Sequence, residues 1–246
     1  MSTKETNLKE KFRLALTSTA KVISDDFTLN DKNSNNRNSE NMIEINDLTN
    51  PSDFIKLRAE TDSTALKKKF SNEKIYRKNL PTNNSSRSLY NIAEKIRYES
   101  LGGKMLKGIE KNYHENYTQI INHKRKDQLK TKEDVPVAEA FEIYMLKNFH
   151  KIQLNTLTTK MLSFWEKDFE KSIDKHKKFL QENLENQNKY SSRFTEILRE
   201  MDIFQSEEDD EKKEENQDQE QNNSSNDDQD KDSDDNKEDN NNEETQ

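Results

Sequence analysis

Few residues of this chain have the types and spacing that catalysis or metal binding needs. The histidines do not pair at the spacing that would let two of them share a metal on one helix face, so we expect all of them to be exposed: His114, His123, His150 and His176. The carboxylate pairs Glu139/Glu142 and Asp168/Glu170 are more typical of a helix surface than of an acid–base site. Without cysteine, and with only three glycines, the chain offers no thiolate and no phosphate loop. We expect no catalytic residue, metal or cofactor in this chain.

The glycines are the most informative feature of the sequence. Gly102, Gly103 and Gly108 all lie within residues 97–113, in a stretch whose surroundings have a helical pattern. A glycine inside a helix costs about 1 kcal/mol relative to alanine, so the cluster needs a local reason. The absence of a Cβ allows another group to approach closely. That group belongs either to the same domain or to a partner or ligand, and both interpretations stay open.

Composition divides the chain into a body and a tail. Only 28% of its 246 residues are hydrophobic and 37% are charged. From Glu207 onward the chain has 19 acidic residues and 4 lysines, a net charge of −15, which leaves +7 for the rest of a chain with 41 basic and 49 acidic residues. From Glu207 onward there is no apolar residue, which predicts disorder, and we place the disordered tail at 204–246. It is either a solubilising extension or an acidic arm that contacts the basic body or a basic partner.

Helical periodicity dominates the body, so the predicted fold class is mostly α, with one helical domain over 7–203. Apolar stripes predict helices over 7–24 and 54–70, and Asn50 followed by Pro51 is a helix-start signal for the second. Residues 27–29 and 42–45 are compatible with a small β-hairpin around a flexible loop at about 30–41.

The third apolar stripe runs from Leu89 to Tyr113, but it slips by one residue at Leu101, beside the glycines. We expect either a kink or a change of packing partner there. A fourth helix is predicted after Pro136. Residues 156–201 predict a long helical hairpin that turns near 185–191, with Trp165 as a packing anchor.

The sequence indicates nucleic-acid binding only weakly, and it does not indicate membrane contact. Lysine clusters at 67–69, 124–126 and 175–178 would allow weak nucleic-acid binding, but no interleaved aromatic residues or known motif accompany them, so we expect none. No signal sequence or membrane-spanning segment is visible, so we expect a cytoplasmic protein without membrane contact.

Three blocks of the sequence resemble the T-subunit family of aerobic cobaltochelatases. Residues 15–24 resemble the family pattern A-L-x-S-T-x-[RK]-x-I-S, and residues 58–66 resemble R-G-x-A-D-x-x-A-L with alanine at position 59. Residues 97–112 resemble R-x-E-[AS]-L-G-[AG]-[RK]-x-[ML]-x-G-[VI]-x-x-N, which is the most specific block. The order of the blocks, a later Trp-containing helical segment and an acidic run also match the family.

The resemblance implies a role in cobalamin biosynthesis. A T subunit assembles with an AAA+ ATPase subunit (CobS) and supports a large chelatase subunit (CobN), which inserts cobalt into hydrogenobyrinic acid a,c-diamide. It is a non-catalytic member of a hetero-oligomer that uses ATP, magnesium and cobalt. We predict partner contact for the third block, through Arg97, Glu99, Gly102, Gly103, Lys104, Gly108 and Asn112.

One departure from the family is large. Family members continue past the acidic run into a von Willebrand A domain with a D-x-S-x-S metal motif, which this sequence lacks. A truncated product, a fragment and one half of a split gene are all compatible with this difference. The alternative functions are an AAA+-associated adaptor outside cobalamin synthesis and a basic helical nucleic-acid binder.

Overall fold

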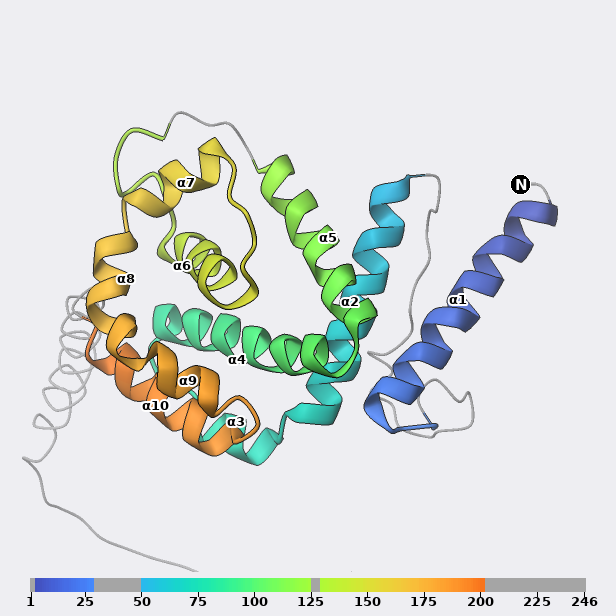
Figure 1. The fold of residues 1–246 in the computed structure, drawn as a ribbon, viewed down its shortest axis with the longest axis horizontal. Coiled ribbons are helices and arrows are strands. Elements are labelled where there is room, and N and C mark those ends of the chain that lie inside the picture. Colours follow the sequence, from blue (N-terminus) through green and yellow to red (C-terminus); the bar gives the residue numbers. More distant parts are fainter. Residues whose placement is uncertain (1–2, 29–49, 125–128, 202–246) are drawn as a thin grey trace, which may run out of the picture. The chain divides into compact units, whose positions relative to one another are not determined.

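The computed structural model describes residues 3–28, 50–124 and 129–201, which belong to the unit Met1–Phe204 (Figure 1). Within these ranges the chain is helical and contains no strand, so the predicted mostly-α class is confirmed. The elements are α1 Thr3–Ser24, α2 Pro51–Phe70, α3 Glu73–Asn79, α4 Asn84–Met105, α5 Lys107–His123, α6 Val137–Met145, η1 Leu146–His150, α7 Thr156–Ser163, α8 Glu166–Ile173, η2 Asp174–His176, α9 Lys177–Glu182 and α10 Gln187–Arg199.

Two predicted features lie wholly or mostly outside the described residues. Of the proposed β-hairpin, Phe27 and Thr28 lie in a turn, and the remainder, with the loop at 30–41, is not described. The acidic tail lies beyond residue 201 and is likewise outside the described ranges.

Helices α1 and α2 form a pair. The side chain of Asn50 accepts a hydrogen bond from the Ser52 N–H at 3.0 Å, and Pro51 opens α2, as the start signal predicted. Phe12 of α1 packs on Phe54 of α2 with ring centroids 4.8 Å apart. At the other end of the pair, Asp26 forms an ion pair with Lys68 of α2.

Helix α4 is the central helix of the unit, because α2, α5, α6, η1 and α10 all pack on it (Figure 1). Its start is capped by the Asn83 side chain, which accepts from the Ser86 N–H at 2.9 Å. Leu89, Ala93 and Ile96 recur at helical spacing and are buried against these neighbours.

The second centre of the core is α6. Phe141 is fully buried, and its ring lies 5.4 Å from Phe169 of α8 and 5.9 Å from Phe194 of α10. After α6 the chain widens into the π-helix η1, which ends when Lys151 adopts a left-handed conformation with φ 56° and ψ 32°. This residue turns the chain at the edge of the cleft described below.

The region after residue 156 differs from the predicted long hairpin. Its first arm is divided into α7, α8, η2 and α9, and only α9 turns through residues 183–186 into α10. Trp165 marks the first break: its indole N–H donates to the Val135 carbonyl at 3.0 Å and its ring stacks on Phe169. The predicted packing role of Trp165 is confirmed. The short helix α3 was not predicted.

Two kinds of feature are absent from the described ranges. No helix there is both long enough and apolar enough to cross a bilayer. In the same residues, no group of three histidine, cysteine, aspartate or glutamate side chains is placed to hold a metal ion.

Candidate functional site

The glycine-rich stretch forms the corner between α4 and α5. A single extended residue, Leu106 with φ −140° and ψ 119°, separates the two helices. Its N–H donates to the Gly102 carbonyl at 2.9 Å, and its own carbonyl accepts from the Ile109 N–H at 3.0 Å. The helical pattern therefore breaks at Leu106, a few residues after the slip at Leu101, and the expected kink within one helix was wrong. The alternative expectation, a change of packing partner, is not contradicted by this break.

Gly102 and Gly103 allow close packing inside the domain. A Cβ on Gly102 would lie 2.6 Å from Leu66 Cδ2 and 3.0 Å from its Cγ, closer than carbon atoms can approach. A Cβ on Gly103 would collide with the hydroxyl end of Tyr113 and lie 3.2 Å from its Cζ. For these two glycines the packing interpretation of the cluster is confirmed.

Gly108 is different. It lies in the first turn of α5, is exposed, and a Cβ there would meet nothing within 4 Å. Close approach within the domain therefore does not explain this glycine.

Arg97 lies wholly inside the domain. Its side chain is fully buried and forms an ion pair with Glu94 at 3.2 Å. The guanidinium also donates to the Phe70 carbonyl at 2.8 Å and to the Leu184 carbonyl at 3.0 Å. Arg97 thus joins the end of α2, the middle of α4 and the turn before α10, and its paired charge satisfies buried backbone acceptors.

Glu99 and Asn112 also face other parts of the domain. Glu99 is buried and accepts hydrogen bonds from the hydroxyls of Ser63 and Tyr117, each at 2.7 Å. Burial raises the pKa of its carboxyl. The half-buried Asn112 donates to Asp62 at 2.6 Å, and burial raises the pKa of Asp62.

These contacts join two of the blocks that carry the family resemblance. Residues 58–66 lie on α2 and residues 97–112 span α4 and α5. They meet through the pairs Ser63–Glu99, Leu66–Gly102 and Asp62–Asn112. These three pairs therefore fix how α2 docks on the α4–α5 corner.

The places of these residues in the fold do not test whether the predicted set contacts a partner. Partner contact therefore stays a prediction. The structure places Arg97, Glu99, Gly102 and Gly103 in the interior and Asn112 half-buried, whereas Lys104 and Gly108 are exposed. Every residue from 104 to 108 is exposed, including the apolar side chains of Met105 and Leu106. The exposed stretch that contains the predicted residues Lys104 and Gly108 is therefore the corner 104–108.

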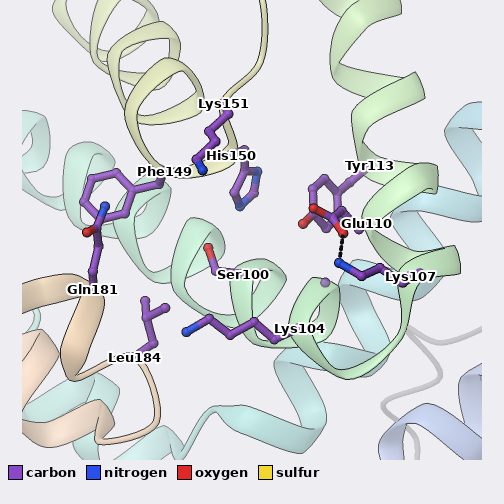
Figure 2. Close-up of a pocket in the computed structure, with 11 residues that line it drawn as sticks. Ser100, Lys104, Lys107, Glu110, Tyr113, Phe149, His150, Lys151, Gln181 and Leu184 are labelled. Carbon is purple, nitrogen blue, oxygen red and sulfur yellow. Dashed lines mark hydrogen bonds and ion pairs between the residues drawn. The ribbon is translucent and has the colours of Figure 1, made fainter.

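A cleft of about 390 Å³ opens beside this corner (Figure 2). It lies between the end of α4, the start of α5, the end of η1 and the turn after α9. Three lysines line it, Lys104, Lys107 and Lys151, and the one carboxylate among its lining residues, Glu110, forms an ion pair with Lys107 at 3.0 Å. The cleft therefore carries an excess of positive charge.

His150 lines the same cleft, and its predicted exposure was wrong. His114 and His176 are half-buried, so the predicted exposure is confirmed only for His123. The side chain of His150 is 5% exposed and stacks on Tyr113 with ring centroids 4.6 Å apart. Burial lowers the pKa of His150 to about 4, so the ring is neutral at pH 7. Sequence reasoning missed its position, although His150 follows Leu146 by four residues and so shares the face of a buried side chain.

Comparison with known proteins gives one match. A family model described as "cobalamin biosynthesis protein CobT" matches residues 6–246. Comparison with curated proteins and with solved structures finds no match to this chain. The family match spans nearly the whole sequence and includes the three blocks whose residues build α1, the α2 docking face and the α4–α5 corner. The chain belongs to the CobT family of cobalamin biosynthesis proteins.

Proposed function

We propose that this chain is a non-ATPase subunit of an ATP-dependent cobaltochelatase that acts in cobalamin biosynthesis. The match of the CobT family model to residues 6–246 is the observation that carries the proposal. In the proposed enzyme, an AAA+ ATPase subunit hydrolyses ATP with magnesium, and a large chelatase subunit inserts cobalt into hydrogenobyrinic acid a,c-diamide. This chain joins the two and contributes no catalytic residue.

The exposed corner 104–108 is the surface that we assign to the AAA+ subunit. Leu106 is 47% exposed and Met105 is 39% exposed, and these apolar side chains lie between Lys104 and Lys107. Apolar contact supplies binding energy, and flanking charges supply orientation and selectivity. The packing of Gly102 and Gly103 holds the corner in place from inside.

Reconstitution tests the function. Purified AAA+ and large subunits from the same source are mixed with ATP, magnesium, cobalt and hydrogenobyrinic acid a,c-diamide, with and without this chain, and cobalt insertion is followed by absorbance. We expect insertion only when the chain is present. Equal insertion without it would overturn the proposal.

Co-purification with the AAA+ subunit tests the corner separately. Leu106→Asp and Lys104→Glu should each weaken binding by about tenfold or more, equivalent to about 1.4 kcal/mol. Ile120→Asp on exposed α5 surface and Lys167→Glu on exposed α8 surface are the matched controls and should bind like wild type. Unchanged binding by the folded corner variants would remove the corner from the interface and leave the chelatase assignment intact.

A further inference from the structure

The cleft beside the corner presents two ammonium groups without a carboxylate partner. Among the described residues, Lys104 and Lys151 form no ion pair, whereas Lys107 is paired with Glu110. Figure 2 shows both unpaired side chains reaching into the space that Ser100, Phe149 and Leu184 border, from opposite sides. Like charges directed at one space repel, and an anion between them removes that repulsion.

The backbone holds Lys151 in this position at a cost. It is one of two non-glycine residues with positive φ in the described ranges, and it has φ 56°. A lysine in this conformation is strained, since glycine or asparagine adopts it more readily. Strained residues persist where the surrounding structure over-determines them, and they cluster at ligand-binding sites.

The wall of the cleft contains a buried polar atom that has no partner. The Nε2–H of His150 donates to the Ile96 carbonyl at 3.4 Å, so Nδ1 of the neutral ring is an acceptor. In the described residues Nδ1 is buried and makes no hydrogen bond. An unpaired buried acceptor is costly, and it lies on a residue that lines the cleft.

We propose that this cleft binds a small phosphate monoester, with the phosphate between Lys104 and Lys151. A tetrahedral dianion matches two ammonium groups that approach from opposite sides, whereas a planar carboxylate carries half the charge in one plane. The cleft, at about 390 Å³, is within the range of small-molecule sites and leaves room for an organic group beside Phe149. The site goes beyond the proposed chelatase role, and it shares Lys104 with the corner assigned to the AAA+ subunit.

Titration calorimetry on the purified full chain at low salt tests the site, with phenyl phosphate, inorganic phosphate and benzoate as probes. We expect phenyl phosphate to bind at one site, inorganic phosphate to bind more weakly, and benzoate to bind weakest. Equal binding of benzoate and phenyl phosphate would contradict a phosphate site, and the absence of saturable binding by either phosphate probe would overturn the proposal.

Variants place the binding in the cleft. Lys151→Gly removes the charge and keeps the left-handed backbone, so the protein should stay folded while its affinity for phenyl phosphate falls about tenfold. Lys104→Gln should have a similar effect, and Lys167→Gln on the exposed surface of α8 should have none. Wild-type affinity in both cleft variants would overturn the proposal. Because no partner subunit is present, this failure is distinguishable from failure of the chelatase assignment.

Discussion

At the scale of single residues, Gly102 shows how the absence of a side chain lets another residue pack closely. The sequence predicted that something approaches the glycines closely, because the chain has no glycine outside this cluster. It could not predict what approaches, because Leu66 lies 36 positions earlier on α2 and no local pattern links the two residues. The same limit applies to His150, whose burial depends on Tyr113 from another helix.

Alanine at the glycines separates their roles. Gly102→Ala should destabilise the domain by about 1–3 kcal/mol, because Leu66 is fully buried and has little room to move. Gly108→Ala should stabilise it by about 0.5–1 kcal/mol, because the new Cβ meets open space on a helix. Urea unfolding measures both changes. A smaller cost of Gly102→Ala in a Leu66→Ala background would confirm the contact.

The buried Glu99 predicts a pH dependence of stability. Burial raises its folded-state pKa above 4.5, so its contribution is fully present below pH 4.5 and is lost as the pH rises through the raised pKa. Glu99→Gln keeps an acceptor for Ser63 or Tyr117 and removes the charge. The variant should gain stability relative to wild type between pH 5 and pH 8 in urea unfolding. An identical pH profile for the two proteins would contradict a buried, destabilised carboxylate.

His150 makes stability depend on pH in the opposite direction to Glu99. Its folded-state pKa of about 4 lies below the ordinary 6.5, so stability is present above pH 6.5 and is lost as the pH falls towards 4. The full effect is about 3 kcal/mol, since one pKa unit corresponds to about 1.4 kcal/mol. His150→Phe should flatten the unfolding profile between pH 4 and pH 6.5. His123→Gln, at an exposed histidine, is the control and should retain the wild-type slope.

At the scale of elements, periodicity and caps predicted most of the helices. Asn50 and Pro51 fixed the start of α2, and Pro136 marked the start of α6. The division of residues 156–182 was missed because the same apolar spacing continues through the breaks. At the first break the indole N–H of Trp165 donates to the Val135 carbonyl, a contact that the local pattern does not contain. Helix α3 was missed because its seven residues are too short to show a period.

Arg97 connects these elements, so its loss should be severe. Arg97→Ala leaves Glu94 buried without its counter-charge and removes donors from two backbone carbonyls, which should cost about 3–5 kcal/mol. Arg199→Ala, on the exposed surface of α10, should change stability by less than about 0.5 kcal/mol. Circular dichroism during urea titration measures the difference. A loss below about 1 kcal/mol for Arg97→Ala would show that the cluster is dispensable.

At the scale of the whole molecule, the three resemblance blocks identified the family before any contact was known. They did not predict that two of them form one internal interface, because a motif records which residues occur and not what they touch. Residues 205–246 contain no apolar side chain that could join a hydrophobic core. The helical unit should therefore keep its unfolding midpoint when residues 205–246 are deleted. A fall of several degrees in differential scanning calorimetry would contradict this prediction.

The arrangement around Arg97 has a consequence for how the protein is made. Residues 70, 94 and 97 leave the ribosome well before Leu184 and before Ser191, whose hydroxyl donates to Glu94 at 2.6 Å. Before those last partners emerge, Arg97 and Glu94 can pair with each other and Arg97 can reach Phe70. The groups that bond to Leu184 and Ser191 stay hydrated until then, so this face of α4 cannot be sealed from solvent. The core around α4 can therefore close only after residues 184–191 have been synthesised.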